Sequence, residues 1–237
     1  MSYETFAYYY DSLMDPKFYD DYQEFIEKHA TFEEVFELGC GTGETAIRLA
    51  KQGYAVYGTD LSSDMLEVAK QKAMAENVTL QLQRVDMRDF TTSRPVDLIL
   101  CLCDSLNYLL NKEDVLKTFQ NVYHSISESG TFIFDVNSLY KMNTILKDYH
   151  ESDEDNEFAF RWDVENKKDG YVEHHVYIED KIEKEVVDEI HLQQTYSVDT
   201  YIDLLKQAGF SDISYYSDFH EYQEECERIT FVCHKKG

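Results

Sequence analysis

"FELGCGTGETAIRLA" (residues 36–50) carries three glycines at alternate positions, Gly39, Gly41 and Gly43, between an apolar run and a helix-like stretch. The run 33–39 is typical of a short buried strand, and the segment after the glycines is typical of a helix that stops at Gly53. Glycines in such a turn let the backbone approach a ligand closely, because a Cβ would hold the ligand away. The stretch predicts a strand–turn–helix unit with a ligand site at the turn.

The same alternation of strand-like and helix-like segments continues along the chain. Further strand-like segments occur at 54–60, 78–86, 96–103 and 131–136, and helix-like segments occur at 62–77 and 112–130. Residues 96–103 are apolar almost throughout, which is typical of a strand covered on both faces. This alternation predicts an α/β fold with a parallel sheet and helices on both faces.

The pattern changes near residue 138. Residues 138–157 are irregular and end in an acidic run, which favours a solvated loop, whereas three alternating segments joined by short polar turns follow at 158–165, 171–180 and 184–197. They predict a small inserted antiparallel β-sheet. A helix-like segment then follows at 198–210, and the segments 213–219 and 228–236 predict antiparallel strands. We therefore expect a main domain of residues 1–137 and 197–237, with residues 1–30 as an N-terminal helical lid or arm, and an insertion of residues 138–196.

The composition limits the kinds of partner. Among 237 residues, 22 are Lys or Arg and 47 are Asp or Glu, which gives a net charge of −25. A surface this acidic repels phosphate backbones and anionic lipids, so we expect neither a nucleic-acid nor a membrane partner. The first residues do not resemble a signal peptide, and the five cysteines form no CxxC pair. These features favour reduced thiols and a cytoplasmic location, and without convergent histidines we expect no metal site.

The residues around the glycines limit the kinds of ligand that the turn can bind. Asp60 ends the second strand-like segment, where a carboxylate can accept hydrogen bonds from ribose hydroxyls. A dinucleotide fingerprint requires a third glycine where this chain has Glu44, and a carboxylate there would repel a pyrophosphate. Glu37 adds a carboxylate just before the turn. The combination favours a ribose-bearing ligand with a cationic head.

At this point the chain resembles a known family. "ELGCGTG" (37–43) followed by "YGTDLSSDML" (57–66) is similar to the class I S-adenosylmethionine-dependent methyltransferases. "VDMRDF" (85–90), "DLILCLCDSLNYL" (97–109) and the closing pair of strands match further landmarks of that family in order. "FAYYYDSLM" (6–14) and "CDSLNYLL" (103–110) look more narrowly like bacterial small-molecule-type members.

The resemblance implies a Rossmann-like, seven-stranded, mostly parallel sheet with a terminal reversed β-hairpin, and S-adenosyl-L-methionine as the cofactor. It implies methyl transfer to a small-molecule acceptor by in-line displacement. Glu37 and the glycine backbone would hold the amino-acid portion, Asp60 would accept from the ribose, and Asp86 would accept from the adenine amine. The full set of expected cofactor-side residues is Tyr10, Glu37, Gly39, Cys40, Gly41, Gly43, Asp60, Leu61, Asp86, Met87 and Cys103. The candidates on the acceptor side are Asp104, Asn107 and Tyr108, and no catalytic base is assigned.

Several alternatives stay open on sequence alone. Asp86 could be a plain strand-end carboxylate, and Asp104 could cap the following helical turn rather than take a proton from an acceptor. The inserted strands could roof the acceptor pocket or form a homodimer contact. A nicotinamide-dependent oxidoreductase and a non-enzymatic S-adenosylmethionine-binding protein are the competing functions. The sequence names neither the acceptor nor the methylated atom.

Overall fold

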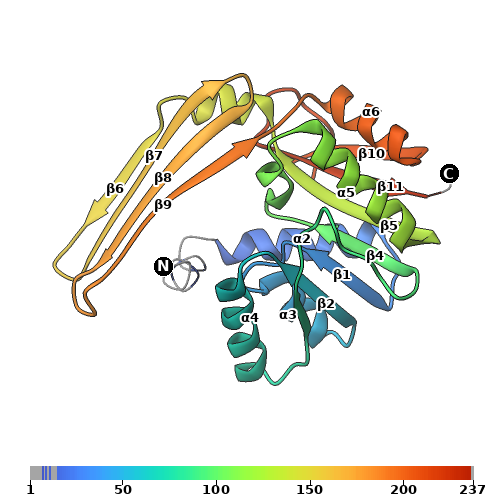
Figure 1. The fold of residues 1–237 in the computed structure, drawn as a ribbon, viewed down its shortest axis with the longest axis horizontal. Coiled ribbons are helices and arrows are strands. Elements are labelled where there is room, and N and C mark those ends of the chain that lie inside the picture. The colour runs from blue at the N-terminus through green and yellow to red at the C-terminus, as the bar shows by residue number, and fades with distance from the viewer. Residues whose placement is uncertain (1–6, 8, 10, 12–14, 236–237) are drawn as a thin grey trace.

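The fold is built on a seven-stranded sheet with one reversed strand. The structure, a computed structural model, describes residues 7, 9, 11 and 15–235. The strand order is β10-β11-β5-β4-β1-β2-β3; all neighbours among β3, β2, β1, β4 and β5 are parallel, and β11 runs antiparallel to both β5 and β10 (Figure 1). The predicted Rossmann-like sheet with a reversed terminal hairpin is confirmed. Its strands are β1 (Glu34–Leu38), β2 (Ala55–Asp60), β3 (Gln81–Arg84), β4 (Val96–Cys101), β5 (Ile126–Asn137), β10 (Asp212–Ser217) and β11 (Arg228–His234).

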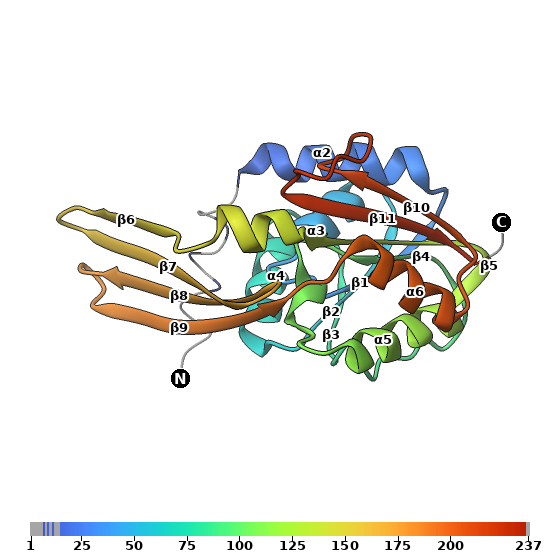
Figure 2. The same ribbon diagram turned by 90° about the horizontal axis from the view of Figure 1, so that it is seen from above.

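Helices cover both faces of this sheet. Figure 2 shows α2 on one side and α5 and α6 on the other. Phe25 and Ile26 of α2 pack on one face of the sheet, and Phe119 of α5 and Leu205 of α6 pack on the other. The helices are α2 (Pro16–His29), α3 (Glu44–Lys51), α4 (Ser63–Ala75), α5 (Lys112–Ser125) and α6 (Val198–Ala208). The two apolar layers bury the central strands on both faces, as the apolar sequence of β4 predicts.

Local signals set several helix starts. The Ser62 hydroxyl accepts from the Met65 N–H at the start of α4, and Ser197 caps α6 through the Thr200 N–H. The helix expected to reach Gly130 ends at Ser125, and β5 begins at the next residue. The sequence showed no break there because Ile126 suits the end of the helix and the start of the strand equally well.

The insertion is a separate four-stranded antiparallel sheet in the order β6-β7-β8-β9, which projects from the main sheet (Figure 1). It contains β6 (His150–Glu154), β7 (Phe158–Lys168), β8 (Tyr171–Asp180) and β9 (Glu185–Gln194), preceded by the short π-helix η3 (Lys141–Ile145). The expectation of three strands and a loop was wrong at β6. All five side chains of β6 are exposed and most are acidic, so its pairing with β7 depends on backbone hydrogen bonds and leaves no apolar alternation in the sequence.

No helix within the described residues is long and apolar enough to cross a lipid bilayer.

Candidate active site

The glycine loop between β1 and α3 makes the turn that the sequence predicts. Gly39, Gly41 and Gly43 all have positive φ, at 65°, 54° and 76°, a region that other residues adopt only with strain. A Cβ on Gly39 would lie 2.7 Å from the Cβ of Ser105, and one on Gly43 would lie 2.9 Å from the Cβ of Ala69. A Cβ on Gly41 would meet nothing within 4 Å. Two of the glycines therefore allow close packing of the protein, and Gly41 exposes its backbone to open space.

Asp60, at the end of β2, fixes this loop. Its Oδ2 accepts from the Gly41 N–H at 2.9 Å, and its Oδ1 accepts from the Ser62 N–H at 2.8 Å. Burial raises the pKa of Asp60, and the backbone hydrogen bonds oppose that rise. A carboxylate oxygen can accept more than one hydrogen bond, so Asp60 can order the loop and still accept from a ligand.

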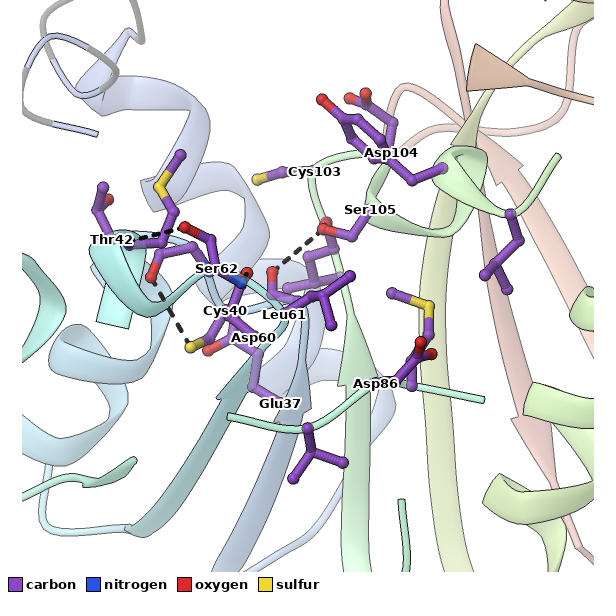
Figure 3. A pocket seen from close by; sticks show the side chains of 18 of the residues that line it. Glu37, Cys40, Thr42, Asp60, Leu61, Ser62, Asp86, Cys103, Asp104 and Ser105 are labelled. Carbon is purple, nitrogen blue, oxygen red and sulfur yellow. Dashed lines mark hydrogen bonds between the residues drawn. The ribbon is translucent and has the colours of Figure 1, made fainter. Parts of the chain in front are cut away.

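A cavity of about 700 Å³ opens beyond the carboxyl ends of β1, β2 and β4. The strand order reverses between β1 and β4, which is where open α/β sheets bind ligands. Figure 3 shows Glu37, Asp60, Asp86, Cys103 and Asp104 converging on it from different elements. Most of the expected cofactor-side residues line it, namely Glu37, Gly39, Cys40, Gly41, Asp60, Leu61, Asp86, Met87 and Cys103.

Glu37 is the least solvated carboxyl group in this cavity. It is only 4% exposed, and its Oε2 has no hydrogen-bond partner in the described part of the chain. Burial and the charge of Asp60 raise the pKa of Glu37 to about 8, against a backbone hydrogen bond from Ala46 that lowers it. A buried acceptor without a partner is costly, so this oxygen is suited to receive a donor or a cation from a ligand.

Asp86 and Met87 form the wall that follows β3. The guanidinium of Arg88 holds the Asp86 carboxylate at 2.6 Å and also reaches Asp114 at 3.1 Å. The hydrogen bonds from Arg88 lower the pKa of Asp86. Asp86 therefore stays ionised and fixed in place, with the Met87 side chain near Gly39.

Glu44 differs from its expected role. It lines the cavity, but its carboxylate binds Lys72 at 2.9 Å and Arg48 at 2.9 Å. Lys72 also binds Asp11 at 2.5 Å, and Asp11 accepts from the Thr42 hydroxyl. Glu44 thus belongs to an ion-pair network that joins the N-terminal segment to the glycine loop, and its charge is already balanced by protein cations.

The end of the cavity where the sequence predicts the acceptor is built around a buried carboxylate, Asp135. Cys103 and Asp104 follow β4 with positive φ of 53° and 51°, and their N–H groups donate to Asp135 at 3.0 and 2.6 Å. Asp135 is 0% exposed and also accepts from the Tyr22 hydroxyl and from Arg228 at 2.7 Å. Since two successive non-glycine residues in this conformation are strained, these bonds are what hold the turn.

The three acceptor-side candidates separate in the structure. Asp104 lines the cavity, and its carboxylate binds Gln193 of β9 at 2.7 Å and Arg228 at 3.1 Å. Tyr108, at the end of the 3₁₀ helix η2 (Ser105–Tyr108), also lines the cavity. Asn107 does not, because its amide is buried and bonds the backbone of Asn137 and Gln194.

Two further expected cofactor-side residues remain. Gly43 begins α3 and packs against α4. Tyr10 lies outside the described residues.

Sequence reasoning missed several residues that line the cavity. Ser105 donates to the Gly39 carbonyl at 3.1 Å, which joins η2 to the glycine loop. Tyr19 of α2 and His191 of β9 reach the cavity from distant segments. Ser105 lies inside the "CDSLNYL" segment, which the sequence already places where the acceptor should arrive, whereas nothing local to Tyr19 or His191 marks those two residues.

The site fits S-adenosylmethionine, the cofactor that the sequence resemblance implies. This molecule carries a sulfonium and an ammonium group against a single carboxylate, and the cavity offers the unpartnered oxygen of Glu37 and the carboxylate of Asp60. The open backbone at Gly41 allows close approach, and the volume is in the range of small-molecule sites. Within the described residues, no group of three or more His, Cys, Asp or Glu side chains could hold a metal ion.

Comparisons with known proteins agree with this chemistry. The methyltransferase domain family matches residues 35–130. Two bacterial relatives are named as methyltransferases, and their names give no substrate. The relative from Geobacillus sp. (strain WCH70) is 37% identical, over 99% of this chain and 100% of the relative. The relative from Bacillus subtilis (strain 168) is 35% identical, over 99% of this chain and 98% of the relative.

Among solved structures, the S-adenosylmethionine-dependent methyltransferase of Clostridium acetobutylicum ATCC 824 superposes with a TM-score of 0.87 at 27% identity, with both chains covered completely. The match extends over the inserted sheet as well as the main sheet. The chain therefore belongs to the S-adenosylmethionine-dependent methyltransferases, and S-adenosylmethionine is its cofactor.

Proposed function

We propose that the protein transfers a methyl group to a small-molecule acceptor by in-line displacement, with the acceptor bound between Cys103 and Tyr108. The observation that carries this proposal is that one cavity extends from the glycine loop to that turn. A cofactor held at the glycine loop and an acceptor held at the turn would share one enclosed space. The strongly acidic surface favours a small acceptor over one with a phosphate backbone.

We assign the cofactor contacts as follows. Glu37 and the backbone of the glycine loop hold the amino-acid portion, with Cys40 inside that loop. Asp60 accepts from the ribose, and Leu61 packs beside the adenine. Asp86 accepts from the adenine amine, with Met87 against the ring and Cys103 beside the methyl-bearing end. Tyr10 is the proposed contact from the N-terminal arm.

The bound cofactor supplies a methyl group on a positively charged sulfur, which a nucleophile can displace directly. This reaction needs little covalent help from the protein, since holding the acceptor in line and excluding water can supply much of the rate. The chain's own contribution is the turn at Cys103 and Asp104, the acceptor wall, which Asp135 and Arg228 hold in place. We also propose that the inserted sheet, within residues 138–196, shapes acceptor access rather than forming a dimer contact, because His191 of β9 lines the cavity and Gln193 of β9 donates to the Asp104 carboxylate.

Calorimetry with S-adenosylhomocysteine tests the cofactor assignment. Asp60→Ala should weaken binding about tenfold or more, because it removes acceptors for the ribose and releases the Gly41 N–H. Asp89→Ala is the matched control, since Asp89 is an exposed carboxylate paired with Lys117 outside the cavity. Undiminished binding by Asp60→Ala would contradict the assigned ribose contact. Firm binding without methyl transfer to any metabolite fraction would favour a non-enzymatic binding protein.

A further inference from the structure

We propose that the methyl acceptor is an amine without an anionic group, and that Tyr108 and His191, backed by Glu189, receive the proton it loses. This inference rests on the proposed methyl transfer and names the class of acceptor for the same site. It depends on three features of the described residues: the charge of the cavity wall, the fixed position of Asp104, and the contact between η2 and β9.

The wall of the cavity is strongly acidic. Two guanidinium groups line it, and both are engaged: Arg84 donates to the Leu61 carbonyl, and Arg88 binds Asp86 and Asp114. An acceptor carrying a carboxylate or phosphate would meet repulsion here, whereas a cationic amine would be attracted. Seven carboxyl side chains line the same cavity: Glu37, Glu44, Asp60, Asp64, Asp86, Asp104 and Asp114. Glu44, Asp86 and Asp114 are paired with Lys or Arg, and the raised pKa of Glu37 keeps it protonated near neutral pH, so the negative charge of the wall comes from Asp60, Asp64 and Asp104.

Asp104 places negative charge where the acceptor binds. Its two oxygens are held by Gln193 at 2.7 Å and Arg228 at 3.1 Å, so the carboxylate cannot turn away from the cavity. Arg228 is shared with the buried Asp135, which leaves two carboxylates against one guanidinium. This net negative charge at the acceptor end favours an ammonium ligand and provides oxygen atoms to hold its N–H groups.

Tyr108 and His191 form the polar contact between η2 and the inserted sheet. The Tyr108 hydroxyl lies 3.4 Å from His191 Nδ1, and His191 Nε2 lies 3.0 Å from Glu189 Oε2. The His191–Glu189 approach has the distance of an ion pair but not the angle of a hydrogen bond. Tyr108 is 49% exposed and lines the cavity beside His191. The pair can thus connect a bound nitrogen to a carboxylate.

His191 contacts the polar groups of Glu189, on its own strand, and of Tyr108, on η2. His174 stands opposite it on β8, and burial lowers the pKa of His174 to about 4, so His174 stays neutral near neutral pH. A neutral His174 adds no positive charge beside His191.

The chemistry balances with these groups. The bound ammonium first gives one proton to the Tyr108 oxygen, while Tyr108 passes its own hydroxyl proton to His191 Nδ1 and the imidazolium rests against Glu189. The lone pair freed on the nitrogen then forms a bond to the methyl carbon, while the carbon–sulfur bond breaks and its electron pair remains on sulfur. The methylated nitrogen leaves with the positive charge that the sulfur has lost. Proton transfer by positioned side chains contributes about a hundredfold or more to such a rate.

The acceptor class is tested with a ¹³C-methyl-labelled donor. A small-molecule extract of Bacillus subtilis is separated at pH 7 into cationic, neutral and anionic fractions, and each is supplied separately to the full-length protein. We expect labelled product from the cationic fraction, with the NMR signal of an N-methyl group. Label only in the anionic or neutral fraction, or in an O- or C-methyl group, would overturn the amine assignment. No label in any fraction, with the cofactor still bound, would instead contradict the proposed methyl transfer itself.

The proton path is tested with His191→Gln in the active fraction. We expect the rate to fall about a hundredfold at pH 7 and the deficit to shrink by pH 9, because the amine then arrives already deprotonated. Affinity for S-adenosylhomocysteine and the melting temperature should stay at the wild-type values. His175→Gln is the matched control, since His175 follows His174 in β8 but its side chain is exposed on the opposite face of the strand. A deficit equal at both pH values would indicate a packing role only, and a wild-type rate would exclude His191 from the path.

Discussion

Replacing Asp135 with asparagine is the sharpest test of how the acceptor wall is held. Oδ1 of Asp135 accepts from the Asp104 N–H and from Arg228, and Oδ2 accepts from the Cys103 N–H and from the Tyr22 hydroxyl. All four partners are donors. An asparagine supplies only one acceptor oxygen. Its side-chain NH2 group is itself a donor, and it would face two of the four donors without accepting from either. The substitution therefore keeps the shape of the side chain and breaks half of the bonds.

The expected loss can be worked from this geometry. Each buried donor left without an acceptor costs about 1–3 kcal/mol. Arg228 also loses one of its two carboxylate partners while it remains buried, and breaking a buried ion pair costs about 3–5 kcal/mol. These contributions overlap, so we expect the free energy of unfolding to fall by about 3–5 kcal/mol in total. For a domain of this size, that lowers the melting temperature by about 10 °C.

Urea unfolding of Asp135→Asn, Arg228→Gln and the double variant measures this coupling. The double variant should be more stable than the sum of the single losses predicts, by about 2 kcal/mol, because removing both partners leaves no unpaired buried charge. Asp153→Asn, in the exposed strand β6, is the control and should change stability by about 0.5 kcal/mol or less. A loss below about 1 kcal/mol for Asp135→Asn, or additive losses, would refute the role given to this carboxylate.

Two further predictions concern the glycine loop and its buried acid. Because the pKa of Glu37 is raised to about 8 from an ordinary value of 4.5, the folded protein holds a proton that the unfolded chain releases. The free energy of unfolding of the wild-type protein should therefore fall from pH 6 to pH 9 by more than that of Glu37→Gln. Denaturant unfolding of both proteins at the two pH values measures this difference, and an equal change in the two proteins would contradict the raised pKa. Gly39→Ala should destabilise the protein more than Gly53→Ala, by about 1–3 kcal/mol, because both positions have positive φ but only Gly39 has Ser105 in the way. Equal melting temperatures for the two variants would show that the loop can move away from Ser105 without loss of stability.

Much of the fold could be predicted from short-range patterns. The apolar run of β4 and the Ser62 cap of α4 each mark their element within a few residues. The strand β6 could not be predicted this way, since its exposed acidic side chains carry no alternation and its position depends on the backbone of β7. The join between α5 and β5 lacks any turn residue, so it too escaped detection.

The two ends of the site differ in how far the sequence reveals them. The cofactor end lies within a few residues of each strand terminus, so Glu37, Asp60 and Asp86 could be named from their places in the motifs. The acceptor end depends on contacts between distant segments. Tyr22 and Arg228 lie 113 and 93 residues from Asp135, and no local pattern announces such pairs.

These long separations have a consequence for the order of events in folding. Contacts between distant segments form late, because the loop-closure entropy must be overcome before the contact stabilises the chain. The glycine loop and β2 can therefore take shape while the turn at Cys103 and Asp104 is still unsupported. The same difference should persist in the native protein. Transient opening of β11 would break the bonds from Arg228 to Asp135 and Asp104 and loosen the turn at Cys103 and Asp104, while the glycine loop stays in place. Hydrogen exchange would then be faster at the Asp104 amide than at Gly41, which would mean that the proposed acceptor end opens more often than the glycine loop.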